Sequence, residues 1–548
     1  MHDVLIATTL DRHGGPAPRD PGVGLPAPGL VSLPRHGDDP SASPSGALVF
    51  FGDSTSDGGP YFDALGQVTD LVPTLDALGY AGRFSNGPVY ADLLPGLLGI
   101  ESSEAFNLAF GSATVLGEIT FGAALAGDIS APIRGDTPRA VLDERIDVAA
   151  QIERFLADPD RPADLGRTTA FLQGGGGDLE TFVPPADPAA LADAAIAFGV
   201  SLGEALRARA ATLVEAGVGT VVLQTSQPAP APLGEALGPG FLQLADLVVG
   251  MQNTVLAEGV AAFRAGGVDA RLVDLNAIVA ELVADGASHG FRETEASFLF
   301  PGDLGAVPPR PELADVPLDQ ILYFDVVHYT TAAHGIIAAF EAASLTSETV
   351  VAGEADDRIE GTGRADLVLG GAGDDVVALG RGDDTALAGL GDDVVRGGRG
   401  DDLLNGGGGS DRIFGGGGRD LLADGAGDDL VAGGRGHDLL IDGAGSDILL
   451  GGAGDDVIVF TEAALFGRDE AERDIVIGGR GADTLVLRVT PETAADLDVA
   501  EPAPILILAS IGLVAIGIET VIVQEGLDLA GAGAAGPLAG DAELWNLL

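Results

Sequence analysis

An aspartate recurs every nine residues in the second half of the chain, and this spacing constrains the fold more than any other feature. The period holds without a miss from residue 357 to residue 456 and returns at 483, after an interruption at 459–473. The aspartates of this register are Asp357, Asp366, Asp375, Asp384, Asp393, Asp402, Asp411, Asp420, Asp429, Asp438, Asp447, Asp456 and Asp483. A fixed short period predicts small structural units stacked along one direction.

Each repeat also carries glycines before its aspartate and an apolar residue after it. The full Gly-Gly-x-Gly-x-Asp pattern precedes Asp375, Asp402, Asp411, Asp420, Asp438, Asp456 and Asp483. An apolar residue stands two positions after each aspartate from 375 to 456, as Val377 and Ile458 do. The glycines allow tight turns, and the apolar residues fill a thin core between stacked strands. A flexible Gly/Asp linker would not keep this register, so we expect an all-β parallel roll over residues 350–490.

The nonapeptide pattern resembles the RTX calcium-binding repeats, which fold as parallel β-rolls. The resemblance implies several structural Ca²⁺ ions held by the aspartates of the register, since carboxylate and carbonyl oxygens are the hard ligands that calcium takes. Residues 351–460 contain 23 acidic residues against 8 arginines. This excess of negative charge opposes folding when no cation is bound.

The whole chain is acidic, with a formal net charge of −55 over 548 residues. Nucleic acid and anionic membrane surfaces would repel it, so neither is an expected partner. The chain has no cysteine, which excludes disulfides and a thiol nucleophile. The apolar segment Pro504–Val523 is interrupted by Glu519, short of the roughly 20 residues that a spanning helix needs. Its β-branched residues and glycines favour two buried strands, so we expect no transmembrane span.

From residue 46 to about 345, short apolar runs alternate with longer helical patterns. The expected strands lie within 46–51, 168–173, 219–224 and 270–275, and the expected helices within 145–158, 190–217 and 241–267. Such alternation predicts a parallel sheet covered by helices on both faces. Ligands bind such sheets beyond the carboxyl ends of the strands. Residues 1–45, rich in Gly, Pro, Asp and Ser, are expected to be a disordered lead-in.

Ser54 follows the first apolar run directly, in the stretch VFFGDSTSDGG, and is therefore expected at that edge of the sheet. Asp325 and His328 stand three residues apart in YFDVVHY, before a helical pattern that begins near Thr330. A hydrolytic serine needs a base, and the base needs a carboxylate that fixes its tautomer. These three residues are the candidate catalytic set. The alternatives are a serine that caps a helix at an ordinary turn and a histidine that caps the following helix.

GDSTSD resembles the first block of the GDSL, or SGNH, hydrolase family. Three further stretches are similar to family segments in family order: GRFSNGPVYADLL at 82–94, NLAFGSAT at 107–114 and FDVVH at 324–328. The resemblance implies an α/β three-layer, flavodoxin-like domain over residues 46–345. It also implies Ser54 as nucleophile, His328 as general base and Asp325 as its orienting partner.

The sequence departs from the family at the positions that stabilise the oxyanion. Gly177, in QGGGGD, stands where the family has an asparagine, and Ser112 stands where it has a glycine, with Gly111 before it. The resemblance therefore implies an oxyanion site built from Ser54, Gly111, Ser112 and Gly177 that lacks one side-chain donor. Loss of one such donor typically lowers kcat by about 10²–10³. Gln173, at the start of the same segment, is an alternative side-chain donor.

Together these features predict a secreted carboxylic ester hydrolase, an esterase or lipase, fused to a calcium-binding β-roll. The alternatives are a carbohydrate O-deacetylase with the same triad and a calcium-binding surface protein whose hydrolase domain is degenerate. The RTX resemblance implies the type I secretion machinery of a Gram-negative bacterium as a partner. It also implies that residues 491–548 form a C-terminal β cap and an export-signal region, since no signal peptide is evident. A second serine motif, GASHG at 286–290, follows a helical pattern, so Ser288 is expected to be a loop residue.

Overall fold

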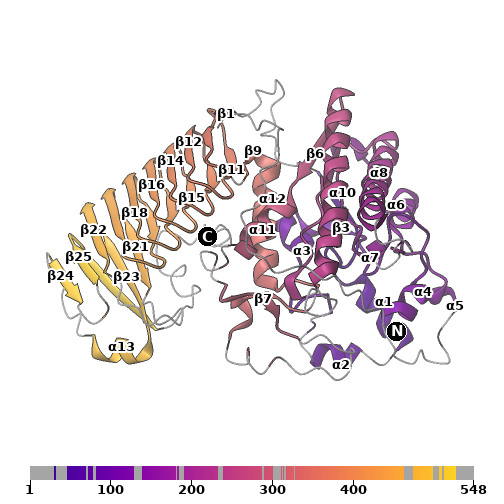
Figure 1. The fold of residues 1–548 in the computed structure, drawn as a ribbon, viewed down its shortest axis with the longest axis horizontal. Coiled ribbons are helices and arrows are strands. Elements are labelled where there is room, and N and C mark those ends of the chain that lie inside the picture. Colours follow the sequence, from indigo (N-terminus) through magenta and orange to yellow (C-terminus); the bar gives the residue numbers. More distant parts are fainter. Residues whose placement is uncertain are drawn as a thin grey trace, which may run out of the picture.

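The computed structural model has an α/β region and a long stack of parallel strands, which lie side by side in Figure 1. The structure describes residues 30–32 and 46–525, apart from 70–71, 78–79, 81, 129–136, 138, 180–181, 184, 186–189, 233–238, 285, 287–288, 290, 300–309, 311–312, 314–315, 326, 354, 462–472, 498–504, 509–510 and 512. Ser288 and the C-terminal tail with Trp545 lie outside the described residues.

The α/β region is built on a five-stranded parallel sheet in the order β3-β2-β4-β5-β6. Its strands are β2 (Leu48–Phe51), β3 (Ala105–Asn107), β4 (Thr169–Leu172), β5 (Thr220–Gln224) and β6 (Asp269–Val273). Numbered along the chain this order is 2-1-3-4-5, that of a flavodoxin-like doubly wound sheet. Four of the five strands lie where the sequence predicted them, and only the short β3 was missed.

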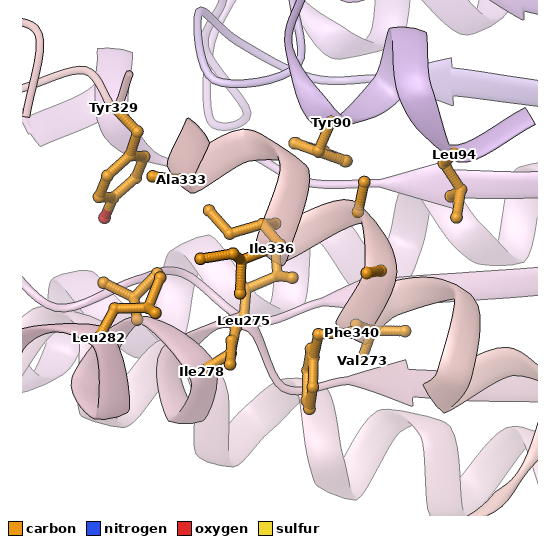
Figure 2. Close-up of a cluster of buried hydrophobic side chains, with 14 of the residues drawn as sticks. Tyr90, Leu94, Val273, Leu275, Ile278, Leu282, Tyr329, Ala333, Ile336 and Phe340 are labelled. Carbon is orange, nitrogen blue, oxygen red and sulfur yellow. The ribbon is translucent and has the colours of Figure 1, made fainter. Parts of the chain in front are cut away.

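Helices cover both faces of this sheet. One face packs against α6 (Val148–Ala157), α8 (Leu191–Glu215) and α10 (Pro239–Ala265), and the other against α3 (Tyr90–Leu97), α11 (Leu275–Ala284) and α12 (Thr331–Thr346). Figure 2 shows the second layer, where Ile336 and Phe340 of α12 face Val273 and Leu275. The predicted three-layer α/β architecture is confirmed.

The remaining elements of this region are short. They are α1 (Pro60–Val68), α2 (Val72–Ala77), η1 (Ser102–Glu104), α4 (Phe121–Asp128), α5 (Arg139–Leu142), η2 (Leu165–Arg167), α7 (Gly176–Leu179), β7 (Glu293–Ser297), η5 (Leu318–Gln320) and β8 (Ile321–Tyr323). An apolar cluster rich in aromatic residues lies among them, in which Phe62 contacts both Tyr80 and Phe84.

The second half of the chain forms two stacked parallel sheets. One sheet contains β9 (Glu348–Val351), β11 (Asp366–Leu369), β13 (Thr385–Leu387), β15 (Leu403–Asn405), β17 (Leu421–Ala423), β19 (Leu439–Ile441), β21 (Val457–Thr461) and β23 (Thr484–Val489). The other contains β10 (Arg358–Glu360), β12 (Val376–Arg381), β14 (Val394–Arg399), β16 (Arg412–Gly417), β18 (Leu430–Arg435), β20 (Ile448–Ala453) and β22 (Ile475–Arg480). Successive strands therefore alternate between the sheets, and from β9 to β21 neighbours within a sheet are 18 residues apart, as Val377 and Val395 are. The apolar residue of each repeat is buried between the sheets, which confirms the predicted parallel β-roll.

The apolar segment near the C-terminus forms three strands, β24 (Ile505–Leu508), β25 (Leu513–Ile516) and β26 (Thr520–Glu525), where the sequence suggested two. The strands β25 and β26 extend the two sheets in parallel, and β24 pairs antiparallel with β25. A short helix, α13 (Pro491–Asp496), precedes them. Among the described residues, no helix is long and apolar enough to cross a membrane.

A short strand from the start of the chain joins the opposite end of the roll. Strand β1 (Leu30–Ser32) pairs in parallel with β10. The expected lead-in therefore includes one paired strand, because the open edge of β10 offers backbone partners that the composition of residues 1–45 does not reveal. The rest of 1–45 lies outside the described residues.

The two regions share one buried apolar cluster, and only Ser347 separates α12 from β9. Leu367 and Leu369 flank the inward-facing Val368, so they point out of the roll. Together with Leu387 of the same sheet they are buried in the cluster that contains Phe340 of α12. These side chains form an apolar seam between the roll and the α/β region, in addition to the direct backbone connection at Ser347.

Candidate active site and candidate metal centre

The first candidate residue, Ser54, lies in a tight turn at the carboxyl end of β2. The Ser56 N–H donates to the Asp53 carbonyl at 3.2 Å, and the Asp57 N–H donates to the Ser54 carbonyl at 3.4 Å. The Ser54 hydroxyl points toward a segment 274 residues away, where its Oγ lies 2.9 Å from Nε2 of His328. The turn thus presents the serine beyond the strand end, as the sequence predicted.

His328 and Asp325 lie in a tight turn between β8 and α12. The Phe324 N–H donates to the His328 carbonyl at 2.8 Å and closes this turn. Nδ1 of His328 lies 2.9 Å from both carboxylate oxygens of Asp325, and Oδ1 of Asp325 also accepts the Val327 and His328 N–H groups at 2.9 Å each. Burial alone would raise the pKa of Asp325, but the charge of His328 and these hydrogen bonds bring it below its usual value.

The three side chains therefore form the continuous chain hydroxyl–imidazole–carboxylate that a serine nucleophile requires. Sequence reasoning missed one member of this arrangement, Tyr80, whose hydroxyl donates to Oδ2 of Asp325 at 2.8 Å. The Phe84 ring lies beside the His328 ring, with centroids 4.8 Å apart. Tyr80 lies 245 residues from Asp325, and no local pattern in the sequence marks it.

The NLAFGSAT stretch at 107–114 lies next to the serine turn and is held by Asp57. The Gly111 N–H donates to Oδ2 of Asp57 at 2.7 Å, and the Gly59 and Tyr61 N–H groups donate to the same carboxylate. Burial raises the pKa of Asp57 to about 7. Gly111 must remain a glycine, because a Cβ there would lie 2.3 Å from the Phe84 ring. Its N–H donates to Asp57, which gives Gly111 a structural role, and its part in an oxyanion site stays a prediction.

Ser112 has φ of 59°, the only positive φ outside glycine among the described residues. This left-handed conformation favours glycine, and it explains why the family pattern places a glycine at this position. Ser112 thus adopts the left-handed backbone conformation expected for the family glycine, although it carries a side chain.

The QGGGGD stretch at 173–178 is bound to the serine turn through Asp53. The Gly176 N–H donates to Oδ2 of Asp53 at 3.1 Å, and burial raises the pKa of Asp53. Asp178 accepts the Val115 and Leu116 N–H groups, and burial raises its pKa to about 6. Gly177 lies between Gly176 and Asp178 in α7, so the position of the family asparagine is present without its side chain.

A buried polar network lies behind the serine turn. Ser56 Oγ lies 2.5 Å from the Tyr90 hydroxyl and donates to Gln173 at 2.8 Å. The Tyr90 hydroxyl donates to Gln224, which in turn donates to Glu341 of α12. The Gln173 amide N–H donates to Gln227 at 3.3 Å. Gln173 therefore supports the turn from behind, with its carbonyl oxygen bound to Ser56 and one of its two amide N–H groups bound to Gln227.

In the roll, the aspartates of the nine-residue register form hydrogen-bonded ladders along both edges. From Asp366 onward each backbone N–H donates to Oδ1 of the aspartate one layer further, as Asp402 does to Asp420 at 3.0 Å. The second oxygen, Oδ2, is buried and has no hydrogen-bond partner within the described part of the chain at Asp375, Asp384, Asp393, Asp402, Asp411, Asp420, Asp429, Asp438, Asp456 and Asp483. Burial raises the pKa of these carboxyl groups, for example to about 8 at Asp411. A row of buried oxygens without donors fits a hard cation such as Ca²⁺.

Two members of the ladders were missed from the sequence. Asp474 continues one ladder after the interruption. It lies 27 residues beyond Asp447, and its Oδ1 accepts the Asp447 N–H at 2.9 Å. Val476 two positions later could have revealed it, because that residue has the apolar character of the repeat. Glu519 ends the other ladder by accepting the Asp483 N–H at 2.8 Å. The residue that interrupts the apolar C-terminal segment is thus the terminal acceptor of the roll.

A doubly wound sheet with a hydrolase-type site at its carboxyl edge, joined to a calcium-binding roll, defines the class of this protein. The chain belongs to the GDSL-like lipase/acylhydrolase family, whose model matches residues 48–340. Four copies of the RTX calcium-binding nonapeptide repeat match residues 351–386, 387–422, 424–458 and 469–487. No curated protein matches the chain significantly.

Proposed function

We propose that this protein cleaves carboxylic esters by a serine mechanism. The observation that carries the proposal is the continuous contact from Ser54 Oγ to His328 Nε2 and from His328 Nδ1 to Asp325, at 2.9 Å for each step. Membership in the lipase/acylhydrolase family supports the same reaction class. An ester of a fatty or small acyl group is the substrate class.

In the proposed reaction, Ser54 Oγ attacks the acyl carbonyl while His328 Nε2 takes the hydroxyl proton. Asp325 stabilises the imidazolium that forms, and Tyr80 and the backbone N–H groups hold this carboxylate in place. The C–O bond to the alcohol then breaks, and His328 returns the proton to the leaving oxygen. Water attacks the acyl-serine with His328 again as base, which releases the acid and restores Ser54.

The negative charge on the carbonyl oxygen needs donors near the nucleophile. By the family pattern these are the backbone N–H groups of Ser54 and Ser112. The left-handed conformation at Ser112 supports this assignment, because it fits the position that the family gives to an oxyanion glycine. Gly177 contributes no side-chain donor, so we expect an active enzyme with a lower kcat than a site with the asparagine.

The roll is proposed to fold on binding Ca²⁺ after export from the cell. The repeat aspartates fit the ion, since ten of them offer a buried oxygen that the described part of the chain leaves without a donor. Bound calcium would neutralise these carboxylates and link turns one layer apart. Cytosolic calcium is scarce and extracellular calcium is millimolar, which suits sites with Kd of about 10⁻⁴–10⁻³ M. Type I export to the extracellular medium is the route that this arrangement favours.

The Ser54→Ala variant tests the proposed activity. Hydrolysis of p-nitrophenyl esters of increasing chain length, and of acetylated oligosaccharides, is compared in the presence of calcium. We expect Ser54→Ala to lower kcat by about 10⁴-fold or more, with the fold unchanged by circular dichroism. Ser102→Ala, an exposed serine on η1, is the matched control and should retain activity.

Activity that survives in Ser54→Ala would overturn the assignment and direct attention to another nucleophile such as Ser288. Wild-type protein with no activity on any of these esters would favour the degenerate-domain alternative. Cleavage of acetylated sugars alone would favour the O-deacetylase.

A further inference from the structure

Two repeats of the roll break the glycine pattern with an additional aspartate. Asp424 and Asp442 stand where the repeat has its first glycine, in DGAGDD and DGAGSD. Neither belongs to the nine-residue register, and the regular ladders do not require them. The two turns are adjacent layers of the same edge, since they are 18 residues apart.

The geometry of ordinary turns shows where such a side chain must lie. At Gly406, a Cβ would lie 2.5 Å from Oδ2 of Asp411, and at Gly433 it would lie 2.5 Å from Oδ2 of Asp438. The first position of each turn therefore lies directly against the carboxylate of the repeat aspartate. A carboxylate placed there adds a second acidic group to the inner side of the turn.

The structure brings Asp424, Asp442 and Asp447 together. One carboxylate oxygen from each lies within 4.8 Å of the others, and all three residues are at most 3% exposed. Oδ1 of Asp424 accepts the Gly425 N–H at 2.8 Å, and Oδ2 of Asp442 accepts the Thr461 N–H at 3.3 Å. Oδ2 of Asp424 is fully buried and has no hydrogen-bond partner in the part of the chain that the structure describes.

This arrangement is unfavourable without a cation. A buried carboxylate without a donor loses its hydration with no compensation, and its two acidic neighbours add repulsion. Burial and the charges of Asp442 and Asp447 raise the pKa of Asp424 well above its usual value. Within the described residues, no other group of three metal-ligating side chains is this close.

We propose that Asp424, Asp442 and Asp447 bind one Ca²⁺ ion more tightly than the ordinary turns of the roll do. An ordinary turn supplies one repeat aspartate to its edge, whereas these two adjacent turns supply additional carboxylates at their first positions. Calcium affinity rises with the number of charged oxygen ligands. The ion at this place is therefore the first to bind as calcium rises and the last to leave under chelation.

Calcium titration of the full-length chain against a chelator of known affinity tests the proposal. Wild-type protein should show one equivalent of Ca²⁺ bound about tenfold or more tightly than the remaining sites. The double variant Asp424→Gly/Asp442→Gly restores the repeat glycine and keeps every repeat aspartate. It should lose the tight equivalent and still fold at millimolar calcium.

The variant Asp424→Asn/Asp442→Asn keeps the side-chain volume and should also lose the tight equivalent. The control Asp392→Asn/Asp428→Asn removes two charges from exposed positions at the same edge, where each residue accepts one backbone N–H, and should retain it. A tight equivalent that persists in the glycine or the asparagine variant would overturn the proposal. A wild-type titration with a single class of sites would overturn it without any variant.

Discussion

The two regions treat their buried carboxylates in different ways. In the α/β region, Asp57 and Asp178 are buried, and each accepts hydrogen bonds from two or more backbone N–H groups. In the roll, a repeat aspartate such as Asp411 accepts one N–H with Oδ1 and has an Oδ2 that is buried without a donor. Backbone N–H groups therefore satisfy these two carboxylates of the α/β region, whereas the repeat carboxylates of the roll need an ion.

The same contrast appears in the apolar cores. The α/β sheet is buried on both faces by helices, and its clusters contain large side chains such as Phe50 and Phe171, whose rings stack at 4.6 Å. The core of the roll is one side chain thick and contains one apolar residue per repeat over most of its length. Apolar burial is thus sufficient for the first region, while the second depends on its turns.

Removal of calcium should have the largest effect, because we expect it to unfold the roll and leave the α/β region folded. In excess chelator we expect the β signal of the full-length chain to fall and proteases to cut within residues 351–487, since the repeat carboxylates would repel one another. The helices and the esterase activity of the α/β region should persist, and added calcium should restore the roll. Equal protease resistance with and without calcium would contradict the expectation that the roll depends on calcium.

Glu341 is a buried carboxylate of the α/β region that resembles those of the roll, and Glu341→Gln tests whether it is uncharged in the folded state. Its Oε2 is buried without a partner among the described residues, and burial raises its pKa to about 8. A raised carboxyl pKa stabilises the folded state at low pH, and this stability is lost as the pH rises toward 8. Between pH 6 and pH 8 the wild type should lose about 2 kcal/mol more than Glu341→Gln does.

Denaturant unfolding of the two proteins in calcium at each pH measures this difference. The glutamine can still accept the hydrogen bond from Gln224, so the variant removes the charge and leaves the contact. Parallel pH dependence of the two proteins would mean that Glu341 stays charged in the folded state.

Gly177→Asn tests whether the active site lacks one donor that the remaining fold could accommodate. We expect kcat on a p-nitrophenyl ester to rise about tenfold with little change in KM, because such a donor acts mainly on the transition state. Gly177→Ala, which adds no donor, is the control. An inactive Gly177→Asn beside an active Gly177→Ala would show that α7 has no room for the asparagine side chain.

Ser112→Gly should give the smallest effect, a gain of about 1 kcal/mol in the stability of the α/β region. Glycine adopts the φ of 59° without the steric conflict that a Cβ brings. Ser112→Ala keeps the Cβ and controls for loss of the hydroxyl. Equal stability of the glycine and alanine variants in thermal unfolding would argue against strain at this residue.

The sequence predicted those parts of the molecule that follow from short patterns. The repeat register gave the roll, and the alternation of strands and helices gave the sheet and the edge at which Ser54 lies. Asp325 and His328 could be paired because they are three residues apart in one turn. Their roles in catalysis remain predictions that Ser54→Ala and its control address.

The parts that the sequence did not reveal depend on contacts between distant residues. Tyr80 reaches Asp325 across 245 residues, and the seam buries Leu387 of the roll with Phe340 of α12. The hydrogen bond from Gly111 to Asp57 was not foreseen, because a motif shows which residues are present and not which N–H groups are engaged. Asp474 was missed because an interruption hides a period that the layers in space still keep.

The ladder of the roll also determines how the length of this chain can change. Each repeat aspartate relies on the aspartate one layer further, and the last one, Asp483, relies on Glu519. A deletion or duplication of 18 residues would keep every donor opposite an acceptor, whereas one of nine residues would transfer all later strands to the other sheet. The steps of 27 residues that end at Asp474 and Asp483 show that nine extra residues can enter between Asp456 and Asp474 while the later strands stay in their own sheets. Repeats are therefore expected to be lost or gained in pairs, whereas extra residues that add no strand can enter between two repeats.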